Sequence, residues 1–131
     1  MLLVVDDETD SLQTLTREMQ LRYGSHYQIV ASGSAPDALD KLAELRDEGV
    51  AVPLVLAHQW MAQLTGAELL ARVRALHPTA RRGLLISWGD LSTAAPILQA
   101  AASGQIEFYL PKPSWSPDEQ FHAAVTKALQ E

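Results

Sequence analysis

Short apolar runs alternate with longer amphipathic stretches along the whole chain. Each run is five or six residues long and mostly apolar, whereas between the runs apolar residues recur at three- and four-residue steps. Runs of that length are typical of buried strands, and the three- and four-residue steps are typical of a helix with one buried face. The alternation predicts strand–helix units arranged around a parallel sheet.

Five of the apolar runs are predicted to be strands. The third run, Pro53 to Ala57, shows no alternation of apolar and polar residues, which is expected for a strand covered on both faces. The predicted strands are residues 2–6, 27–32, 53–57, 83–87 and 106–110.

The stretches between the strands carry signals for helix starts and ends. Residues 9–23 have an apolar face and end at a glycine, and Ser34 followed by Pro36 is a typical helix start. The third helix ends before Pro78, and Pro96 weakens the fourth. The predicted helices are residues 9–23, 34–49, 66–77, 91–103 and a last helix that opens at 116–119.

The expected architecture is one α/β domain that covers residues 1–131. Right-handed crossovers leave few ways to wind five strand–helix units of this size, and the doubly wound, flavodoxin-like strand order 2-1-3-4-5 is the commonest. That order places the carboxyl ends of the first and third strands side by side. Because ligands of open α/β sheets bind at this edge, we expect the functional site there.

Polar residues follow the predicted strands at this edge. Carboxylate oxygens suit Mg²⁺, whereas hydroxyl and ammonium groups can donate hydrogen bonds to phosphoryl oxygens. Such a set predicts a cradle for a divalent cation and a phosphoryl group. The residues expected to meet there are Asp6, Asp7, Glu8, His58, Ser87 and Lys112.

Composition and charge narrow the possible partners. The 131-residue chain has a formal net charge of -6 and only one pair of adjacent basic residues, Arg81 and Arg82, which disfavours direct nucleic-acid binding. It has no cysteine, so disulfides and thiolate metal sites are excluded. No apolar stretch approaches the roughly 18 residues of a membrane span, and the opening residues do not resemble a signal peptide. We therefore expect a cytoplasmic protein without membrane contacts.

Several motifs occur in the order and spacing of a known family. LLVVDDE at 2–8, the third strand with its later Thr65-Gly66, LLIS at 84–87 and YLPKP at 109–113 together resemble a CheY-like receiver domain over essentially the whole chain. The resemblance implies a two-component (phosphorelay) signalling module that is not an enzyme. It also implies a Mg²⁺ site at Asp6, Asp7 and the main-chain carbonyl of Trp60, and phosphate-sensing positions at Ser87, Tyr109 and Lys112.

The sequence departs from the family's pattern at the position that receives the signal. His58 stands where the family has the aspartate that accepts phosphate from a histidine kinase, so aspartyl phosphate cannot form there. Ala62 replaces a common proline and Trp88 a usually small residue. We expect an atypical receiver whose switch residues survive while its usual input is lost. The missing third carboxylate is expected to weaken Mg²⁺ binding.

The roles of individual side chains stay open at this point. His58 can be a structural filler, a ligand for a metal such as Zn²⁺, or a phosphorylated histidine. Lys112 can contact a phosphoryl group, or simply neutralise the two aspartates by pairing with them. The Lys112–Pro113 peptide bond is expected to be cis, as is common in the family. Three further histidines lack ligand-like spacing and are expected to be ordinary surface or helix-end residues: His26, His77 and His122.

Two other classes of function are alternatives to signalling. Asp6, Asp7 and His58 can form a metal-binding or metal-dependent centre, and the chain can be a structural dimerisation module. RYGSHYQIVASGSAPDAL, at 22–39, also looks like part of receivers that are fused ahead of a thioredoxin-reductase-like flavoprotein module. The expected partners are proteins: a histidine kinase, a fused or associated effector domain, or a second copy bound through the fourth and fifth helices and the fifth strand.

Overall fold

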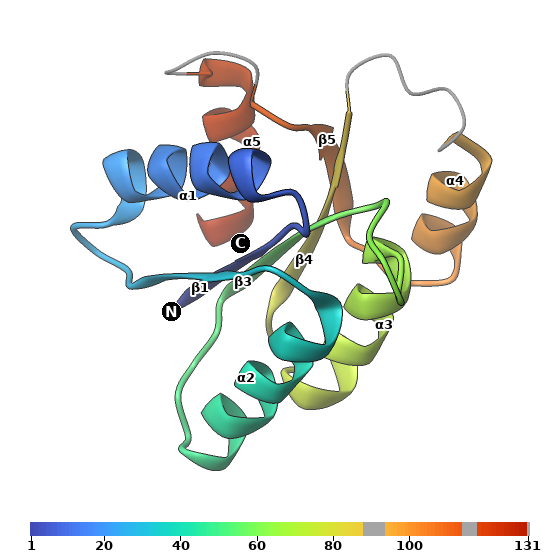
Figure 1. Ribbon diagram of the computed structural model, residues 1–131, viewed down its shortest axis with the longest axis horizontal. Coiled ribbons are helices and arrows are strands. Elements are labelled where there is room, and N and C mark those ends of the chain that lie inside the picture. The colour runs from blue at the N-terminus through green and yellow to red at the C-terminus, as the bar shows by residue number, and fades with distance from the viewer. Residues whose placement is uncertain (88–93, 114–117, 131) are drawn as a thin grey trace.

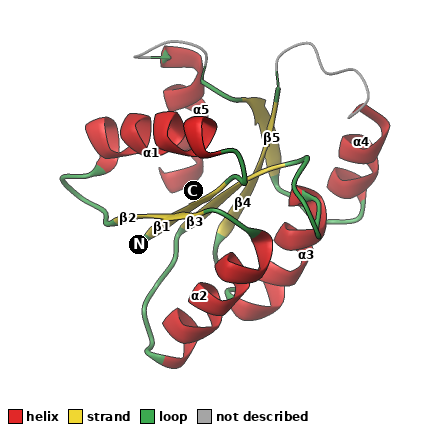
Figure 2. Cartoon of the chain, viewed as in Figure 1, coloured by secondary structure: helices red, strands yellow, loops and turns green. Residues whose placement is uncertain are grey.

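The computed structural model of the protein describes residues 1–87, 94–113 and 118–130 (Figures 1 and 2). The strands form one five-stranded parallel sheet in the order β2-β1-β3-β4-β5, which confirms the expected doubly wound α/β fold. The strands are β1 (Leu2–Val5), β2 (Ile29–Ser32), β3 (Leu54–His58), β4 (Arg81–Ile86) and β5 (Phe108–Pro111). The helices are α1 (Thr9–Tyr23), α2 (Ala35–Asp47), α3 (Gly66–Leu76), α4 (Ala94–Ala102) and α5 (Glu119–Gln130).

Helices cover both faces of the sheet. In Figure 1, α1 and α5 lie on one face, whereas α2, α3 and α4 lie on the other. Successive side chains of a strand point to opposite faces, so Leu2 and Val4 pack with α1 and α5, while Leu3 and Val5 pack with α2 and α3. Two cores, one on each face, explain why the inner strands show no polar alternation.

The sequence signals for helix ends act as predicted. Ser34 caps α2 by accepting a hydrogen bond from the Asp37 N–H. Thr65 and Glu68, which the sequence prediction did not single out as a cap, form a reciprocal capping box at the start of α3. Gly24 caps the carboxyl end of α1. Each side-chain cap stabilises its helix by about 1 kcal/mol because it satisfies a backbone N–H that has no partner within the helix.

Strand β4 begins two residues earlier than the apolar pattern predicts. Arg81 and Arg82 belong to the strand although both are charged, because Glu107 lies 2.9 Å from Arg81 and 3.4 Å from Arg82. The buried Arg82 guanidinium also donates to the carbonyls of Gly104 and Gln105, at 2.9 and 2.8 Å. Arg82 therefore ties the turn that follows α4 to the sheet.

The other element boundaries differ little from the prediction. β2 and β5 begin two residues later than predicted, at Ile29 and Phe108. The predicted starts of the last two helices, 91–93 and 116–117, lie outside the described residues, which continue from Ala94 and Asp118. In the part of the chain that the structure describes, no helix has the length and apolar character needed to cross a membrane.

Candidate functional site

Polar side chains from three strands lie at the edge of the sheet where the carboxyl ends of the strands meet. Asp6 follows β1 directly, His58 is the last residue of β3, and Lys112 follows β5 directly. The parallel register pairs Val5 with Ala57, so the residues that follow them, Asp6 and His58, are neighbours. The structure thus brings together the carboxylate, the imidazole and the ammonium group that the sequence placed at this edge.

Asp6 is the centre of this cluster. Its side chain is fully buried and lies 2.9 Å from Lys112 Nζ, while its other oxygen accepts a 3.0 Å hydrogen bond from the Glu8 N–H. Burial would raise the pKa of the Asp6 carboxyl, but the contacts with His58 and Lys112 outweigh this effect and hold the pKa well below its usual range. Asp6 is therefore a buried anion that its neighbours stabilise.

Lys112 is held between β1 and the first turn of α1. Besides its ion pair with Asp6, its ammonium group donates a 2.7 Å hydrogen bond to the hydroxyl of Ser11. A hollow of about 260 Å³ lies beside it and is lined in part by Ser11, Thr14 and Pro113. Of the two sequence interpretations of Lys112, pairing with a carboxylate is the one seen, and its partner is Asp6. Ser11 was missed because a single serine in an amphipathic helix carries no motif.

His58 is buried, and its ring lacks hydrogen-bond partners. The side chain is 9% exposed, and Nδ1 lies 3.6 Å from Asp6 Oδ1, which is too long for a hydrogen bond. Both ring nitrogens are shielded from solvent and have no partner among the described residues. A buried polar group without a partner lowers the free energy of unfolding. Hydrogen bonding within the fold therefore does not explain why a histidine stands at position 58.

The backbone of His58 contributes to the turn that leads into α3. A Cβ on Gly66 would lie 2.4 Å from the His58 carbonyl oxygen, so only glycine fits there. Gln59, which the sequence did not single out, binds the same turn: its carbonyl accepts from the Gly66 N–H at 2.8 Å, and its side-chain oxygen accepts from the Ala67 N–H at 3.0 Å. This turn fixes the end of β3 and hence the position of the imidazole.

Asp7 contacts the loop after β3. It is exposed, and its Oδ2 accepts a 2.8 Å hydrogen bond from the Ala62 N–H. Trp60, whose carbonyl was expected to bind Mg²⁺, lies in the same loop with its residue 43% exposed. Gln63 adopts a φ of 75°, which is uncommon for a residue other than glycine.

The donor set does not fit a tightly held cation in this arrangement. Asp6 is fully buried and already contacts Lys112, and Asp7 accepts from the loop backbone. Within the described ranges, no group of three or more histidine, aspartate or glutamate side chains could hold a metal ion. The alternative of a metal centre built from Asp6, Asp7 and His58 is therefore not favoured.

The remaining switch positions lie outside this cluster of buried contacts. Ser87 is exposed directly after β4. Tyr109 is 51% exposed on β5 and lines a hollow of about 380 Å³ together with Lys127 of α5. Trp88, the other tryptophan expected at this edge, lies outside the described residues.

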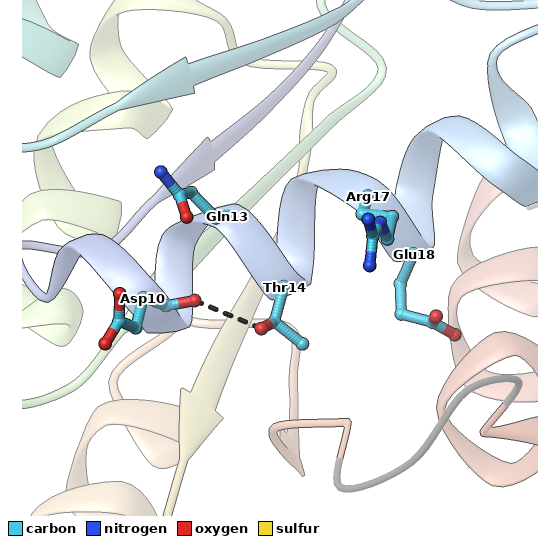
Figure 3. A pocket seen from close by; sticks show the side chains of 5 residues that line it. All are labelled: Asp10, Gln13, Thr14, Arg17 and Glu18. Atoms are coloured by element: carbon cyan, nitrogen blue, oxygen red, sulfur yellow. Dashed lines mark hydrogen bonds between the residues drawn. The ribbon is translucent and has the colours of Figure 1, made fainter.

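A second buried polar cluster joins α1 to α5. Glu18 Oε1 lies 3.1 Å from His122 Nε2, and the Tyr23 hydroxyl lies 3.3 Å from His122 Nδ1 and 3.0 Å from the Thr126 hydroxyl. In Figure 3, Glu18 points from α1 toward α5, and all five labelled side chains, Glu18 included, line a hollow of about 570 Å³ along the helix.

Of the three histidines expected at the surface or at helix ends, two are buried, His77 and His122. The surface expectation for His122 is wrong: it is 2% exposed because it lies on the side of α5 that packs against α1. His77 does end α3, as expected. It is also buried, and its Nε2 lies 2.8 Å from the Leu42 carbonyl oxygen. Only His26 of the three is exposed.

The fold and the sequence are similar to those of solved proteins. An uncharacterized protein from Neptuniibacter caesariensis is 30% identical, with a TM-score of 0.80 over 98% of this chain and 86% of that one. The signal receiver domain of an HD domain-containing protein from Pseudomonas fluorescens is 32% identical, with a TM-score of 0.75 over 98% and 85%. A CheY-like response regulator receiver domain protein from Methanospirillum hungatei shares the fold at 19% identity, with a TM-score of 0.73 over 98% and 93%. No family model and no curated protein matches the sequence.

Proposed function

We propose, since the chain belongs to the family of CheY-like response regulator receiver domains, that it is a non-enzymatic signalling module controlled without aspartyl phosphate. The observation that carries the proposal is the buried His58 at the end of β3, beside Asp6 and without hydrogen-bond partners. An imidazole cannot form an aspartyl phosphate. Both ring nitrogens are also shielded from solvent, so a phosphoryl donor does not reach them in this arrangement.

The output parts of a receiver support a role in signalling. Ser87 and Tyr109 match the positions that sense the phosphoryl group in the family, and both are exposed. A receiver is a two-state element, and its input biases an equilibrium that already exists. We propose that contacts with a protein bias this equilibrium here. The relative from Pseudomonas fluorescens is the receiver of an HD domain-containing protein, which supports an associated effector domain as the partner.

We propose that Mg²⁺ binds only weakly at Asp6, Asp7 and the Trp60 carbonyl. To bind the cation, Asp6 would have to give up its ion pair with Lys112, and Asp7 would have to give up its hydrogen bond with the Ala62 N–H. A third carboxylate would compensate for the loss of those contacts, but His58 occupies its position. Titration of the tryptophan fluorescence of the protein with MgCl₂ should show half-saturation in the His58→Asp variant at a lower Mg²⁺ concentration than in the wild type.

The test of the proposed function restores the carboxylate. The wild type, His58→Asp and His58→Asn are incubated with acetyl phosphate and Mg²⁺, and their intact masses are followed over time. We expect a labile phosphoryl adduct on His58→Asp alone, because the introduced carboxylate can attack phosphorus and release acetate. His58→Asn is the matched control, since it has a similar size and no nucleophilic carboxylate.

Either of two outcomes would contradict the proposal. A phosphoryl adduct on the wild type, mapped to His58, would show that the imidazole itself accepts phosphate. No adduct on any variant, with all three folded by circular dichroism, would show that the pocket is no longer a phosphate cradle.

A further inference from the structure

The hydrogen bond between Lys112 and Ser11 is not explained by the proposed function. Lys112 is the only lysine or arginine in contact with the buried Asp6 in the described part of the chain. Its ammonium group is directed to two oxygens, Asp6 Oδ2 at 2.9 Å and Ser11 Oγ at 2.7 Å. Neither ring nitrogen of His58 contacts it. The lysine is therefore held on the α1 side of the pocket.

We propose that Ser11 is a positioning residue that holds the Lys112 ammonium group away from position 58 and so lowers the response of the pocket to an anion there. This inference rests on the proposed function, because it concerns the same pocket. An anion at position 58 has to compete with both Ser11 and Asp6 for the ammonium group. Ser11 and Asp6 thus both hold the Lys112 ammonium group away from position 58.

The chemistry of the hydroxyl fits this role. A serine hydroxyl has one donor and can accept two hydrogen bonds. Ser11 accepts from Lys112, and its side chain also helps to lower the pKa of the Asp6 carboxyl. The three side chains therefore support one another, and removal of the hydroxyl leaves Lys112 with Asp6 alone.

The location of the contact also fits. Ser11 is half-buried in the first turn of α1, and the Lys112 side chain is 17% exposed. A hydrogen bond to a charged group gains strength where water is partly excluded. Neighbouring Thr14 lines the same hollow, but its hydroxyl donates to the Asp10 carbonyl at 3.1 Å (Figure 3) and not to the lysine. Thr14 therefore offers a matched control.

The first experiment measures how available the lysine is, without any use of phosphorylation. The wild type, Ser11→Ala, Ser11→Thr and Thr14→Ala are treated briefly with acetic anhydride, and acetylation is mapped by mass spectrometry at the three lysines of the chain, Lys41, Lys112 and Lys127. We expect Ser11→Ala to raise the rate at Lys112 about fivefold, the usual worth of one hydrogen bond. Ser11→Thr should restore the slow rate, because threonine keeps the hydroxyl, and Thr14→Ala should leave it unchanged.

The other two lysines are internal references in that experiment. Unchanged rates at Lys41 and Lys127 show that a variant has not unfolded, so a change at Lys112 reports a local effect. An equal rate at Lys112 in the wild type and in Ser11→Ala would overturn the inference. So would a threonine variant that reacts as fast as the alanine variant.

The second experiment tests the consequence in the pocket. The rates of phosphorylation by acetyl phosphate are compared for His58→Asp and for His58→Asp with Ser11→Ala. We expect the double variant to react about fivefold faster, because Lys112 is then easier to recruit to the incoming phosphoryl group. An equal or slower rate in the double variant would overturn the inference. If neither variant reacts, the proposed function fails, and the acetylation rates decide the role of Ser11 separately.

Discussion

Two buried carboxylate–imidazole pairs among the described residues differ in how completely their polar groups are hydrogen-bonded. Between α1 and α5, Glu18 lies 3.1 Å from His122, and both ring nitrogens of His122 have partners. At the carboxyl edge of the sheet, Asp6 lies 3.6 Å from His58, and neither ring nitrogen of His58 has a hydrogen-bond partner within residues 1–87, 94–113 and 118–130. The same two chemical groups therefore occur once within a complete network and once outside one.

The difference separates a residue that serves the fold from one that does not. A fully satisfied buried network specifies how its elements pack, whereas a buried polar group without partners lowers stability. His122 fixes α5 against α1 through Glu18 and Tyr23. His58 makes no such link, so its position is set by the strand and by the turn that follows it.

The largest loss of stability is expected when the pair between Glu18 and His122 is broken. His122→Leu removes the imidazole from a glutamate that is 2% exposed, and we expect a loss of about 3 kcal/mol in the free energy of unfolding. Urea denaturation followed by circular dichroism measures it. The control is His26→Leu, at an exposed position, which should change stability little. Equal losses for the two variants would contradict the structural role of His122.

A smaller loss of stability is expected when Lys112 is removed from its contact with Asp6. Lys112→Met leaves the fully buried Asp6 without its ammonium partner, and we expect a loss of about 2 kcal/mol, because a buried charge loses much of its compensation. Lys127→Met is the matched control, since Lys127 is exposed on α5. A Lys112 variant as stable as the Lys127 variant would show that Asp6 does not depend on this ion pair.

The contribution of Asp6 should depend on pH. The pKa of its carboxyl is lowered in the folded protein, so Asp6 stabilises the fold above the unfolded-state pKa of about 3.9, and this stability is lost as the pH falls toward the folded-state pKa. The stability difference between the wild type and Asp6→Asn should be constant from about pH 7 to 5 and should shrink below about pH 4. Urea denaturation across this range measures it, and a constant difference down to about pH 3 would contradict the lowered pKa.

The smallest effect is expected at His58. His58→Leu relieves two buried ring nitrogens that have no hydrogen-bond partner among the described residues, but it also removes the 3.6 Å contact that helps to stabilise the Asp6 anion. Because these two effects oppose each other, the free energy of unfolding should stay within about 0.5 kcal/mol of the wild type. The informative measurement is the ratio of this effect to that of His122→Leu under the same conditions. A loss at His58 as large as that at His122 would remove the contrast between the two pairs.

The fold could be predicted from the sequence because its signals are local and repeated. The period of apolar residues located α1 at Thr9–Tyr23 as predicted, and the strand order followed from the handedness of crossovers. The prediction was wrong at the start of β4, which the apolar run placed at Gly83, after Arg81 and Arg82. Their charges are compensated by Glu107, which lies far along the chain, and a local pattern contains no such information.

The candidate site could be predicted only in part. Asp6, His58 and Lys112 meet because each stands at the end of a parallel strand, and strand ends are visible in the sequence. Ser11 and His122 were not recognised, because their roles come from contacts with residues 101 and 104 positions away. A helical serine or histidine looks the same in the sequence whether or not such a partner exists.

The contact between Glu18 and His122 also bears on the order in which the protein can form during synthesis. The two residues are separated by 104 positions, so the face of the sheet that α1 and α5 share is only partly covered until most of the chain has left the ribosome. The opposite face closes sooner, because α2 and α3 follow one another along the chain. Apolar surface that waits for a late partner is prone to aggregate. The nascent chain is thus most prone to aggregate on the face covered by α1, because Leu15 and Met19 lack their packing partners until α5 has been synthesised.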